Sequence, residues 1–347
     1  MIEHLHRIAA HAWHVGEMEV GRRACEKLLA QPLSDRLEAI VRRNRTWYTS
    51  RLCDLMKVTY HRLTPPVGEW TAFNPSIVAT ADGWIVNVRS SNYRIVDGRY
   101  VIPPEDGETI RTRNVLCDLA DDFTLTLARE IRCDYERTAY PVDGLEDVRL
   151  NVVGGELVAS ATTRNVAPHD GTCRISVGMV KDWDIPDLVC RETLDGVHEK
   201  NWMPILGRRE WLYSCRAQDH VATVVEDGES WIVTTRAESP LRCRGFRGGS
   251  QLVPIGGGRW LAIIHEVAHD GNRRIYEHRF VTFREHEDWR IDAVSEPFAI
   301  RESRTIEFVA GLAVKSNRVA ISFGVRDEEA WIAEAPLDVI LASMEAV

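Results

Sequence analysis

Residues 74 to 90 read NPSIVATADGWIVNVRS, which gives a polar residue, a short strand, a tight turn at Ala81-Asp82-Gly83 and a strongly apolar strand. Val, Ile and Trp favour strands, and an Asp-Gly pair favours a hairpin turn. Four later segments follow the same plan: EDVRLNVVGGELVASAT from Glu146, KNWMPILGRREWLYSCR from Lys200, GSQLVPIGGGRWLAIIHE from Gly249, and EFVAGLAVKSNRVAISFGV from Glu307. The chain therefore contains five copies of one two-stranded unit.

The spacing of these copies predicts a β-propeller. The leading polar residues recur about every 50 to 70 residues, and a period near 50 with several strands per period is typical of propeller blades. Five copies predict an all-β fold of five blades, whose innermost strands line a central funnel. We expect the leading polar residues to converge in that funnel: Asn74, Asp147, Asn201, Ser250 and Glu307. A pair of β-sandwiches would also fit the repetition.

The N-terminal part of the chain has a helical pattern instead. Apolar residues recur at helical spacing in two short stretches that are separated by Gly16, and Pro32 ends the second stretch. Ser34 or Asp35 can cap a third helix, which is expected to run towards Leu55.

These patterns divide the chain into two parts. We expect a short α-helical N-terminal extension over residues 1–57, which resembles one unit of a helical repeat, and a five-bladed propeller over residues 58–347. Within the propeller, helical spacing returns only from about Pro336 to Met344, which predicts a C-terminal helix.

Composition excludes several classes of protein. The chain has 347 residues, of which 44% are hydrophobic and 27% charged, so it is neither disordered nor fibrous. Its net charge of −9 argues against a general affinity for nucleic acid. No stretch approaches the roughly 20 apolar residues of a membrane span, and the N-terminus does not read as a signal peptide. Eight cysteines without a CxxC pair are expected to be reduced thiols, so we expect a cytoplasmic protein.

One motif is a formal match to a zinc site. Residues 265–269 read HEVAH, and HExxH binds zinc when a helix brings both histidines to one face. Here the motif follows WLAII, which is a strand pattern, and histidines four apart in a strand lie roughly 13 Å from each other. We therefore expect no metal site, and metal analysis of the purified protein would test the alternative of a zinc hydrolase.

Two short motifs carry candidate chemistry. In the first, GLEDVR, the adjacent acids Glu146 and Asp147 precede Arg149, and alternation in a strand lets one acid enter the funnel. A carboxyl group in a partly desolvated funnel can act as a general acid, although a nearby arginine lowers its pKa. A salt bridge at the edge of a blade would explain the same residues.

The second motif, HEKNW, places Lys200 and Asn201 beside Trp202. An ammonium group binds anions and an aromatic face can stack on a sugar ring, so the triplet suits a sugar or phosphate site. Many surface loops contain such a triplet, and Trp202 fits the blade core equally well. Trp84, Trp211 and Trp260 follow the repeat turns and are expected in the core.

Taken in order, the motifs NP…R, GLEDVR, KNWMP, GG…P…GRWL…H and FGVRD resemble glycoside hydrolase family 130 over residues 72–335. The resemblance implies a five-bladed propeller that phosphorolyses or hydrolyses β-mannosides. The chain also resembles propeller mannosyltransferases that use a nucleotide sugar or mannose phosphate. The helical start resembles the tail of repeat-containing glycosyltransferases that carry a propeller at their C-terminus.

The resemblance also implies a role for each matching residue. Asp147 would be the general acid. Contacts to the sugar and to an anion would come from Arg89, Arg149, Lys200, Asn201, His265, Tyr276 and Asp327. Three positions differ from the family pattern: Val148 replaces a proline, Glu199 replaces an aspartate, and Arg326 lies where small residues are usual.

Hydrolysis and phosphorolysis need different partners for the acid. An inverting hydrolase needs a second carboxylate about 6.5 to 9.5 Å from the acid to activate water. The candidates are Glu307 and Asp327, which open and close the fifth repeat. A phosphorylase or a transferase with a phosphorylated donor needs an anion clamp instead, which arginine suits. Arg89, Arg149, Lys200 and His265 are candidates for that clamp.

The sequence therefore predicts an enzyme that makes or breaks a mannoside-like glycosidic bond with inversion, as a glycoside phosphorylase or as a glycosyltransferase dependent on a sugar phosphate or nucleotide sugar. The candidate catalytic residues are Asp147, Glu307 and Asp327, and the candidate substrate-binding residues are Asn74, Arg89, Glu146, Arg149, Lys200, Asn201, Trp202, Ser250, His265 and Tyr276. The alternatives are an inverting glycoside hydrolase and a non-catalytic glycan-binding propeller. Inorganic phosphate or a phosphorylated sugar is the expected co-substrate, with no other cofactor. The expected partner is a small molecule or an oligosaccharide, with neither nucleic acid nor membrane, and homo-oligomer formation stays open.

Overall fold

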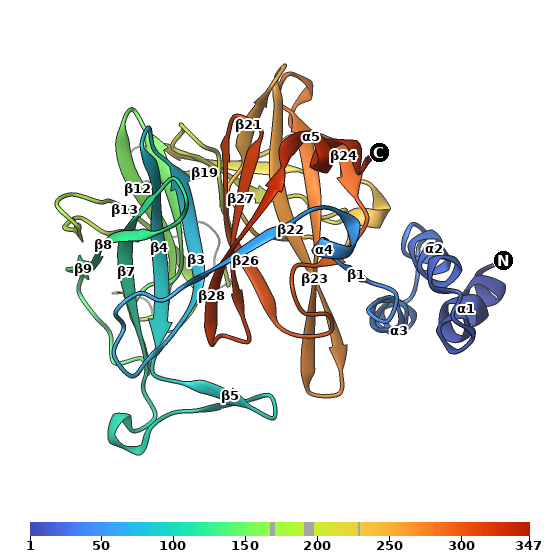
Figure 1. The fold of residues 1–347 in the computed structure, drawn as a ribbon, viewed down its shortest axis with the longest axis horizontal. Coiled ribbons are helices and arrows are strands. Elements are labelled where there is room, and N and C mark those ends of the chain that lie inside the picture. The colour runs from blue at the N-terminus through green and yellow to red at the C-terminus, as the bar shows by residue number, and fades with distance from the viewer. Residues whose placement is uncertain (167–170, 191–197, 228–229) are drawn as a thin grey trace.

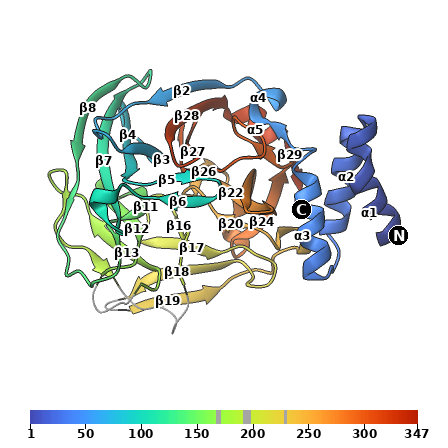
Figure 2. The same ribbon diagram turned by 90° about the horizontal axis from the view of Figure 1, so that it is seen from below.

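Five sheets surround a central axis in the computed structural model of the chain (Figures 1 and 2). The structure describes residues 1–166, 171–190, 198–227 and 230–347. Each sheet contains a core of antiparallel strands that run outwards from the axis in chain order.

The strands of the blades have the following bounds. Blade 1 contains β3 (Thr71–Ala79), β4 (Gly83–Ser91), β7 (Ile110–Ala120) and β8 (Leu125–Glu130). Blade 2 contains β11 (Glu146–Val153), β12 (Glu156–Thr163), β13 (Arg174–Met179) and β15 (Val189–Cys190). Blade 3 contains β16 (Met203–Pro204), β17 (Glu210–Ser214), β18 (Ala222–Asp227) and β19 (Ser230–Thr235). Blade 4 contains β20 (Arg247–Gly248), β21 (Val253–Gly256), β22 (Arg259–Asp270), β23 (Arg273–Arg284) and β24 (Arg290–Ser295). Blade 5 contains β26 (Glu307–Lys315), β27 (Arg318–Val325), β28 (Glu329–Pro336) and β2 (Thr59–Leu63).

The five blades form a complete ring. Inner strands of neighbouring blades pack on each other at every junction: β3 with β11, β11 with β16, β17 with β20, β22 with β26, and β26 with β3. The outer strand of blade 5 is β2, which comes from the N-terminal side of the propeller and pairs antiparallel with β28. Blade 5 is therefore built from both ends of the propeller segment. This arrangement confirms the predicted five-bladed propeller, and the sandwich alternative is wrong.

The hydrophobic core is divided among the junctions between blades. One cluster of buried side chains lies between each pair of neighbouring blades, and a sixth lies within the N-terminal helices. Trp84, Trp211 and Trp260 belong to these clusters, as expected. Strands that are apolar on both faces suit this packing, because each sheet covers its neighbour on either side.

The helices lie mainly at the N-terminus, beside blade 4 (Figure 2). They are α1 (Ile2–His11), the 3-10 helix η1 (Ala12–Val15), α2 (Met18–Leu29), α3 (Asp35–Arg45) and α4 (Leu52–Leu55). The side chain of Ser34 caps α3. The predicted third helix is shorter than expected, because α3 ends at Arg45 and β1 (Ser50–Arg51) follows it to pair with β25 (Phe298–Ala299). The predicted C-terminal helix is α5 (Leu337–Ala342).

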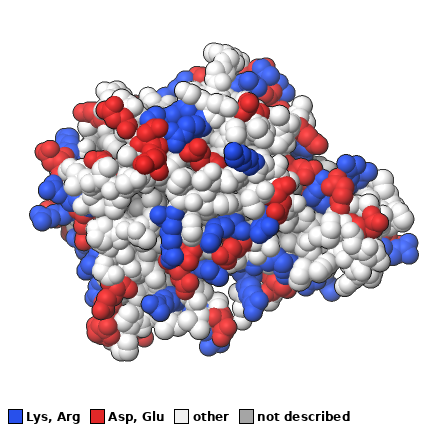
Figure 3. Space-filling model, in the orientation of Figure 1, with Lys and Arg blue, Asp and Glu red and all other residues white. Residues whose placement is uncertain are grey.

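The remaining elements are short. The strands are β5 (Arg94–Val96), β6 (Arg99–Val101), β9 (Arg132–Cys133), β10 (Val142–Asp143), β14 (Asp184–Ile185) and β29 (Met344–Ala346). The 3-10 helices are η2 (Pro104–Asp106), η3 (Leu241–Cys243) and η4 (Glu285–Glu287). Among the described residues, no helix is long and apolar enough to cross a membrane. Acidic and basic side chains are interspersed over the face drawn in Figure 3.

Buried ion pairs join the helices to blade 4. Arg45, only 1% exposed, donates to Glu266 on β22 (2.8 Å) and to Glu277 on β23 (2.7 Å). Glu26 on α2 accepts hydrogen bonds from Arg279 on β23 (2.8 and 2.9 Å). Burial raises the pKa of Glu266, but the surrounding arginines outweigh it and hold that pKa well below its ordinary value. Buried ion pairs of opposite charge therefore hold the helices against blade 4.

Candidate active site in the propeller funnel

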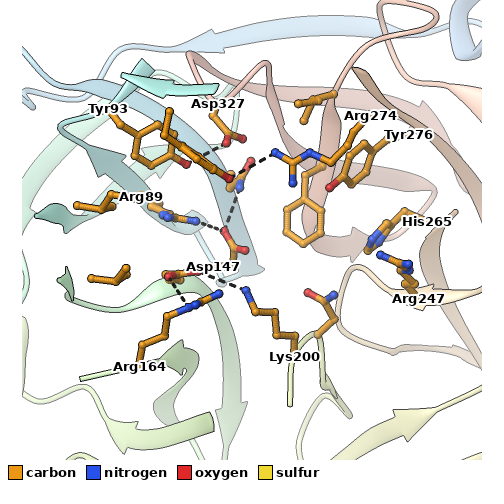
Figure 4. Close-up of a pocket in the computed structure, with 18 residues that line it drawn as sticks. Arg89, Tyr93, Asp147, Arg164, Lys200, Arg247, His265, Arg274, Tyr276 and Asp327 are labelled. Atoms are coloured by element: carbon orange, nitrogen blue, oxygen red, sulfur yellow. Dashed lines mark hydrogen bonds and ion pairs between the residues drawn. The ribbon is translucent and has the colours of Figure 1, made fainter. Parts of the chain in front are cut away.

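A polar cavity of about 400 Å³ opens on the axis of the propeller, and all five blades contribute to its wall (Figure 4). Nine of the residues proposed from the sequence line it: Asn74, Arg89, Glu146, Asp147, Lys200, Asn201, His265, Tyr276 and Asp327. The structure adds lining residues that the repeat pattern did not indicate: Tyr93, Tyr100, Ile110, Val142, Arg164, Arg247, Arg274, Ile306 and Phe308.

Asp147 lies near the centre of this cavity (Figure 4). Its Oδ1 accepts hydrogen bonds from Asn74 Nδ2 (2.9 Å) and from Arg89 Nη1 (2.7 Å). In the described part of the chain no donor to Oδ2 is found, so this oxygen is available to a ligand. Asp147 also lies at an irregularity in the pairing of β11 with β12, between Glu146 and Arg149. Such a bulge redirects a side chain away from the regular alternation of a strand.

A left-handed backbone marks the leading polar residue of three blades. Asn74, Asp147 and Asn201 have φ angles of 45°, 50° and 62°, which Asn and Asp tolerate better than other non-glycine residues. Gly324 makes room for the first of them, because a Cβ atom there would lie 2.1 Å from Asn74 Oδ1. The three side chains reach the same cavity from equivalent positions, as expected from the repeat.

The other two leading residues do not reach the cavity. Ser250 is fully buried, and its Oγ accepts a hydrogen bond from the Ile263 N–H (2.9 Å). Glu307 is also fully buried, and its carboxylate accepts the backbone N–H groups of residues 300, 301 and 302 at 2.6 to 2.9 Å. Burial raises the pKa of Glu307 to about 7, although those three hydrogen bonds oppose the rise. Glu307 therefore holds a turn, and the structure does not place it where it could activate water on a sugar.

Two further expectations need correction. Arg149 is 2% exposed and lies outside the cavity lining, where its guanidinium donates to Gly249 O (2.7 Å) and Asn201 Oδ1 (3.3 Å). It therefore supports the wall of the cavity through the backbone carbonyl of Asp147 (3.3 Å) and the side chain of Asn201. Trp202 is 2% exposed because it packs against Trp211 and Trp231 in the core between blades 2 and 3, so its faces are not available to a sugar ring.

The two carboxyl groups on the cavity wall have different proton affinities. Burial raises the pKa of Asp147, but Arg89, Asn74 and Arg149 stabilise the charged form more strongly and the net effect is a lowered pKa. Asp327 has a raised pKa, chiefly through burial, although Arg89 and the hydrogen bond from Tyr93 (2.9 Å) oppose it. Pairs of acids whose pKa values are pushed apart are typical of proton-transfer sites.

Cations outnumber carboxylates in the lining. The cations are Arg89, Arg164, Lys200, Arg247 and Arg274, and the carboxylates are Glu146, Asp147 and Asp327. Glu146 lies 3.6 Å from Arg164 and 3.8 Å from Lys200. Arg247 lies beside His265 in Figure 4, and its backbone pairs with His265 in the sheet. Among the described residues, its guanidinium has no hydrogen-bond or ion-pair partner. The cavity therefore has unused positive charge.

His265 forms an uncharged part of the wall. It lies in strand β22, so the strand interpretation of HEVAH is confirmed. Its ring stacks on Tyr276 with centroids 5.3 Å apart, and burial holds its pKa well below the ordinary value. Its buried Nδ1 has no hydrogen-bond partner in the described part of the chain. A neutral imidazole with a free nitrogen can exchange a hydrogen bond with a ligand.

A hairpin partly covers the cavity. Strands β5 and β6 extend from blade 1 across the opening (Figure 2), and the hairpin turn at Gly98 lies close to Asn272 in the β22–β23 turn of blade 4. Arg274 donates to Tyr100 Oη at 3.4 Å across this contact. Arg274 follows a turn, where its sequence alone suggests a solvated face, but the structure turns it to the cavity. No sequence repeat indicated these residues, because the hairpin is an insertion between two strands of one blade.

Comparison with known proteins gives the fold. No family of sequences and no curated protein matches the chain. Among solved structures, β-1,2-mannobiose phosphorylase from Listeria innocua has a TM-score of 0.55 at 14% identity, over 83% of this chain and 99% of that one. A structure from the GH130 family of mannoside phosphorylases, which contains glycoside hydrolases that target β-1,2 mannosidic linkages in Candida mannan, has a TM-score of 0.51 at 13% identity, over 82% and 96%. MPT-4, a mannose phosphorylase from Leishmania mexicana in complex with phosphate ion, has a TM-score of 0.51 at 12% identity, over 84% and 92%. The chain resembles these GH130 proteins in the fold of its propeller.

Proposed function

We propose that the chain is a carbohydrate-active enzyme that transfers a glycosyl group, with inversion, between phosphate and the hydroxyl group of an acceptor. The observation that carries the proposal is the surplus of cations around a cavity that also holds the ionised Asp147. Phosphate carries the charge that such a cavity lacks, and arginine binds it through paired hydrogen bonds. The fold likeness to mannoside phosphorylases supports a mannoside-like substrate, and a phosphorylated sugar or a nucleotide sugar would supply the same chemistry.

Asp147 is the proposed acid and base. In the direction of synthesis, the acceptor oxygen attacks C1 of a sugar 1-phosphate, the bond from C1 to the phosphate oxygen breaks, and phosphate leaves. The proton of the acceptor hydroxyl moves to Asp147, whose lowered pKa keeps it ionised and ready to accept. In phosphorolysis the same proton returns to the leaving oxygen, so Asp147 then acts as the acid.

The anion would be held by the unused cations of the wall. Arg247 is the first candidate because its guanidinium lines the cavity and has no partner among the described residues. Arg274 and Lys200 are further candidates. Among the described residues Arg274 donates to Tyr100 Oη, and Lys200 forms a long ion pair with Glu146 (3.8 Å). The neutral His265 can supply a further hydrogen bond.

Hydrolysis is the second candidate, with roles that differ from the expectation. The raised pKa of Asp327 suits a proton donor, and the lowered pKa of Asp147 suits the base that activates water. Hydrolysis with Asp147 as acid and Asp327 as base would need both pKa values to move in the opposite direction. This alternative does not use the surplus of cations, and we therefore prefer transfer to or from phosphate.

Ligand-induced stabilisation tests the proposal. Phosphate, sugar 1-phosphates, nucleotide sugars and free hexoses are added separately, and the thermal midpoint is measured. A ligand at a hundred times its dissociation constant stabilises the native state by about 2.7 kcal/mol. We expect stabilisation by phosphate or a phosphorylated sugar that is lost in Arg247→Ala and retained in Arg290→Ala, an exposed arginine paired with Glu287. Stabilisation by neutral sugars alone would refute the anion site and favour a hydrolase or a glycan-binding propeller.

A further inference from the structure

The cavity in the funnel continues into two others. A second cavity of about 320 Å³ shares Lys200, Asn201 and Arg247 with the first. A third cavity of about 420 Å³ shares Arg216, Asp219 and Arg247 with the second. The shared residues place the three cavities side by side, from the funnel along the boundary of blades 3 and 4 to α3 of the N-terminal helices. We call the second and third cavities the side groove.

Most charges on the walls of the side groove beyond Arg247 are paired with one another. Arg216 Nε donates to Asp219 Oδ2 (2.6 Å), which also accepts from Ser214 Oγ (3.2 Å). On the helical side, Glu38 of α3 pairs with Arg42 (2.8 Å) and with Arg244 (2.9 Å). Each of these cations already has a carboxylate, so the side groove offers hydrogen-bonding groups without a strong demand for a charged ligand.

The second cavity also holds a carboxyl group that lacks a donor. Glu199 lines it and is 3% exposed, yet neither of its oxygens has a hydrogen-bond partner among the residues that the structure describes. A buried polar group without a partner costs free energy, and a ligand that supplies a donor removes this cost. The half-buried ring of Tyr213, which lines the same cavity, adds an aromatic surface of the kind that packs on sugar rings. Hydroxyl donors and an apolar ring face are the two features of a neutral sugar.

We propose that the side groove binds the acceptor, and that this acceptor is a neutral oligosaccharide extending from the funnel towards α3. The inference rests on the proposed function, because it places the acceptor relative to the phosphate-bearing sugar in the funnel. Arg247 stands at the junction of all three cavities and separates the anionic reactant from the neutral one. The helical extension then has a role in acceptor binding, since α3 contributes Asp35, Glu38 and Arg42 to the far wall.

The test measures how the affinity for an oligosaccharide changes with the number of its sugar residues. Neutral oligosaccharides of one to five residues, built from mannose, glucose or galactose, are titrated into the whole protein in the presence of phosphate. We expect affinity to rise with each residue that enters the side groove. Arg216 is exposed in the groove, and Arg216→Ala should lower the affinity for the longer oligosaccharides by about tenfold. Arg209→Ala is the matched control, because Arg209 forms a similar ion pair with Glu226 (2.7 Å) in the same blade and lies outside all three cavities.

A second variant separates binding from folding. Gln218 is exposed and lines the third cavity, so Gln218→Ala should lower the affinity for the longest oligosaccharides without a change in thermal midpoint. The proposal that the side groove binds the acceptor is refuted if affinity does not depend on the length of the oligosaccharide. It is also refuted if both groove variants keep the length dependence of the wild type. Binding of phosphate or sugar phosphate in that case leaves the proposed function standing. Failure of every phosphate compound and every sugar to bind overturns both.

Discussion

The unpartnered carboxyl of Glu199 makes a quantitative prediction about stability. Burial raises its pKa from 4.5 to about 7, with Arg174 opposing the rise. Between these two pH values the folded state keeps a proton that the unfolded state has released, so stability falls as pH rises. This rise corresponds to at most about 3 kcal/mol of destabilisation above pH 7, because solvent near the carboxyl group screens part of the effect. Glu199→Gln removes this cost because the amide carries no charge.

The assay is urea unfolding of wild type and Glu199→Gln between pH 4.5 and 8.5. We expect similar stability at pH 4.5 and a variant that is more stable by up to about 3 kcal/mol at pH 8.5. Glu307→Gln is the matched control: its pKa is raised to a similar value, but its oxygens accept three backbone N–H groups. An amide nitrogen cannot accept these bonds, so that variant should lose stability at every pH. A difference between wild type and Glu199→Gln that does not change with pH would refute the reasoning.

Three further predictions concern the cavity and the helices. Arg247→Ala should raise KM for the phosphate-bearing reactant by about 10- to 100-fold, because a charge-assisted hydrogen bond is lost; an unchanged KM in steady-state kinetics would remove Arg247 from the anion site. Asp147→Asn should lower kcat by about 10²- to 10⁴-fold while calorimetry shows that the phosphorylated sugar still binds. Arg45→Met should destabilise the protein to urea by about 3–5 kcal/mol, since buried Glu277 loses its partner, whereas exposed Arg51→Met should cost less than about 1 kcal/mol.

The repeat was sufficient to predict the blades. Each copy contributes two inner strands that are covered on both faces, so the same apolar pattern recurs wherever a blade recurs. The pattern also predicted Asn74, Asp147 and Asn201 in the funnel. It could not show that Ser250 and Glu307 point into the protein, because side chains at equivalent positions can bond to different neighbours. Ser250 accepts a hydrogen bond from a strand N–H group, and Glu307 accepts hydrogen bonds from the N–H groups of a turn.

The residues that complete the cavity depend on contacts between segments far apart in the sequence. Tyr100 reaches the site on the β5–β6 hairpin, whose turn meets blade 4 at Asn272, and no local pattern predicts that meeting. Arg247 lies on a two-residue strand with no distinctive neighbours, so only its position beside His265 reveals it. The sequence also left open whether burial or a nearby arginine decides the pKa of Asp147. Arg89 and Asn74 from blade 1 outweigh the burial, and no local pattern places them there.

Phosphate release is the measurement that tests the central claim most directly. Sugar 1-phosphates and nucleotide sugars are incubated with the protein and a set of hydroxyl acceptors, and released phosphate or nucleotide is measured together with the glycoside formed. We predict release that requires the acceptor, that is matched by an equal amount of inverted glycoside, and that Asp147→Asn abolishes. Cleavage of glycosides to free sugar without any dependence on phosphate, or turnover that survives Asp147→Asn, would contradict the account.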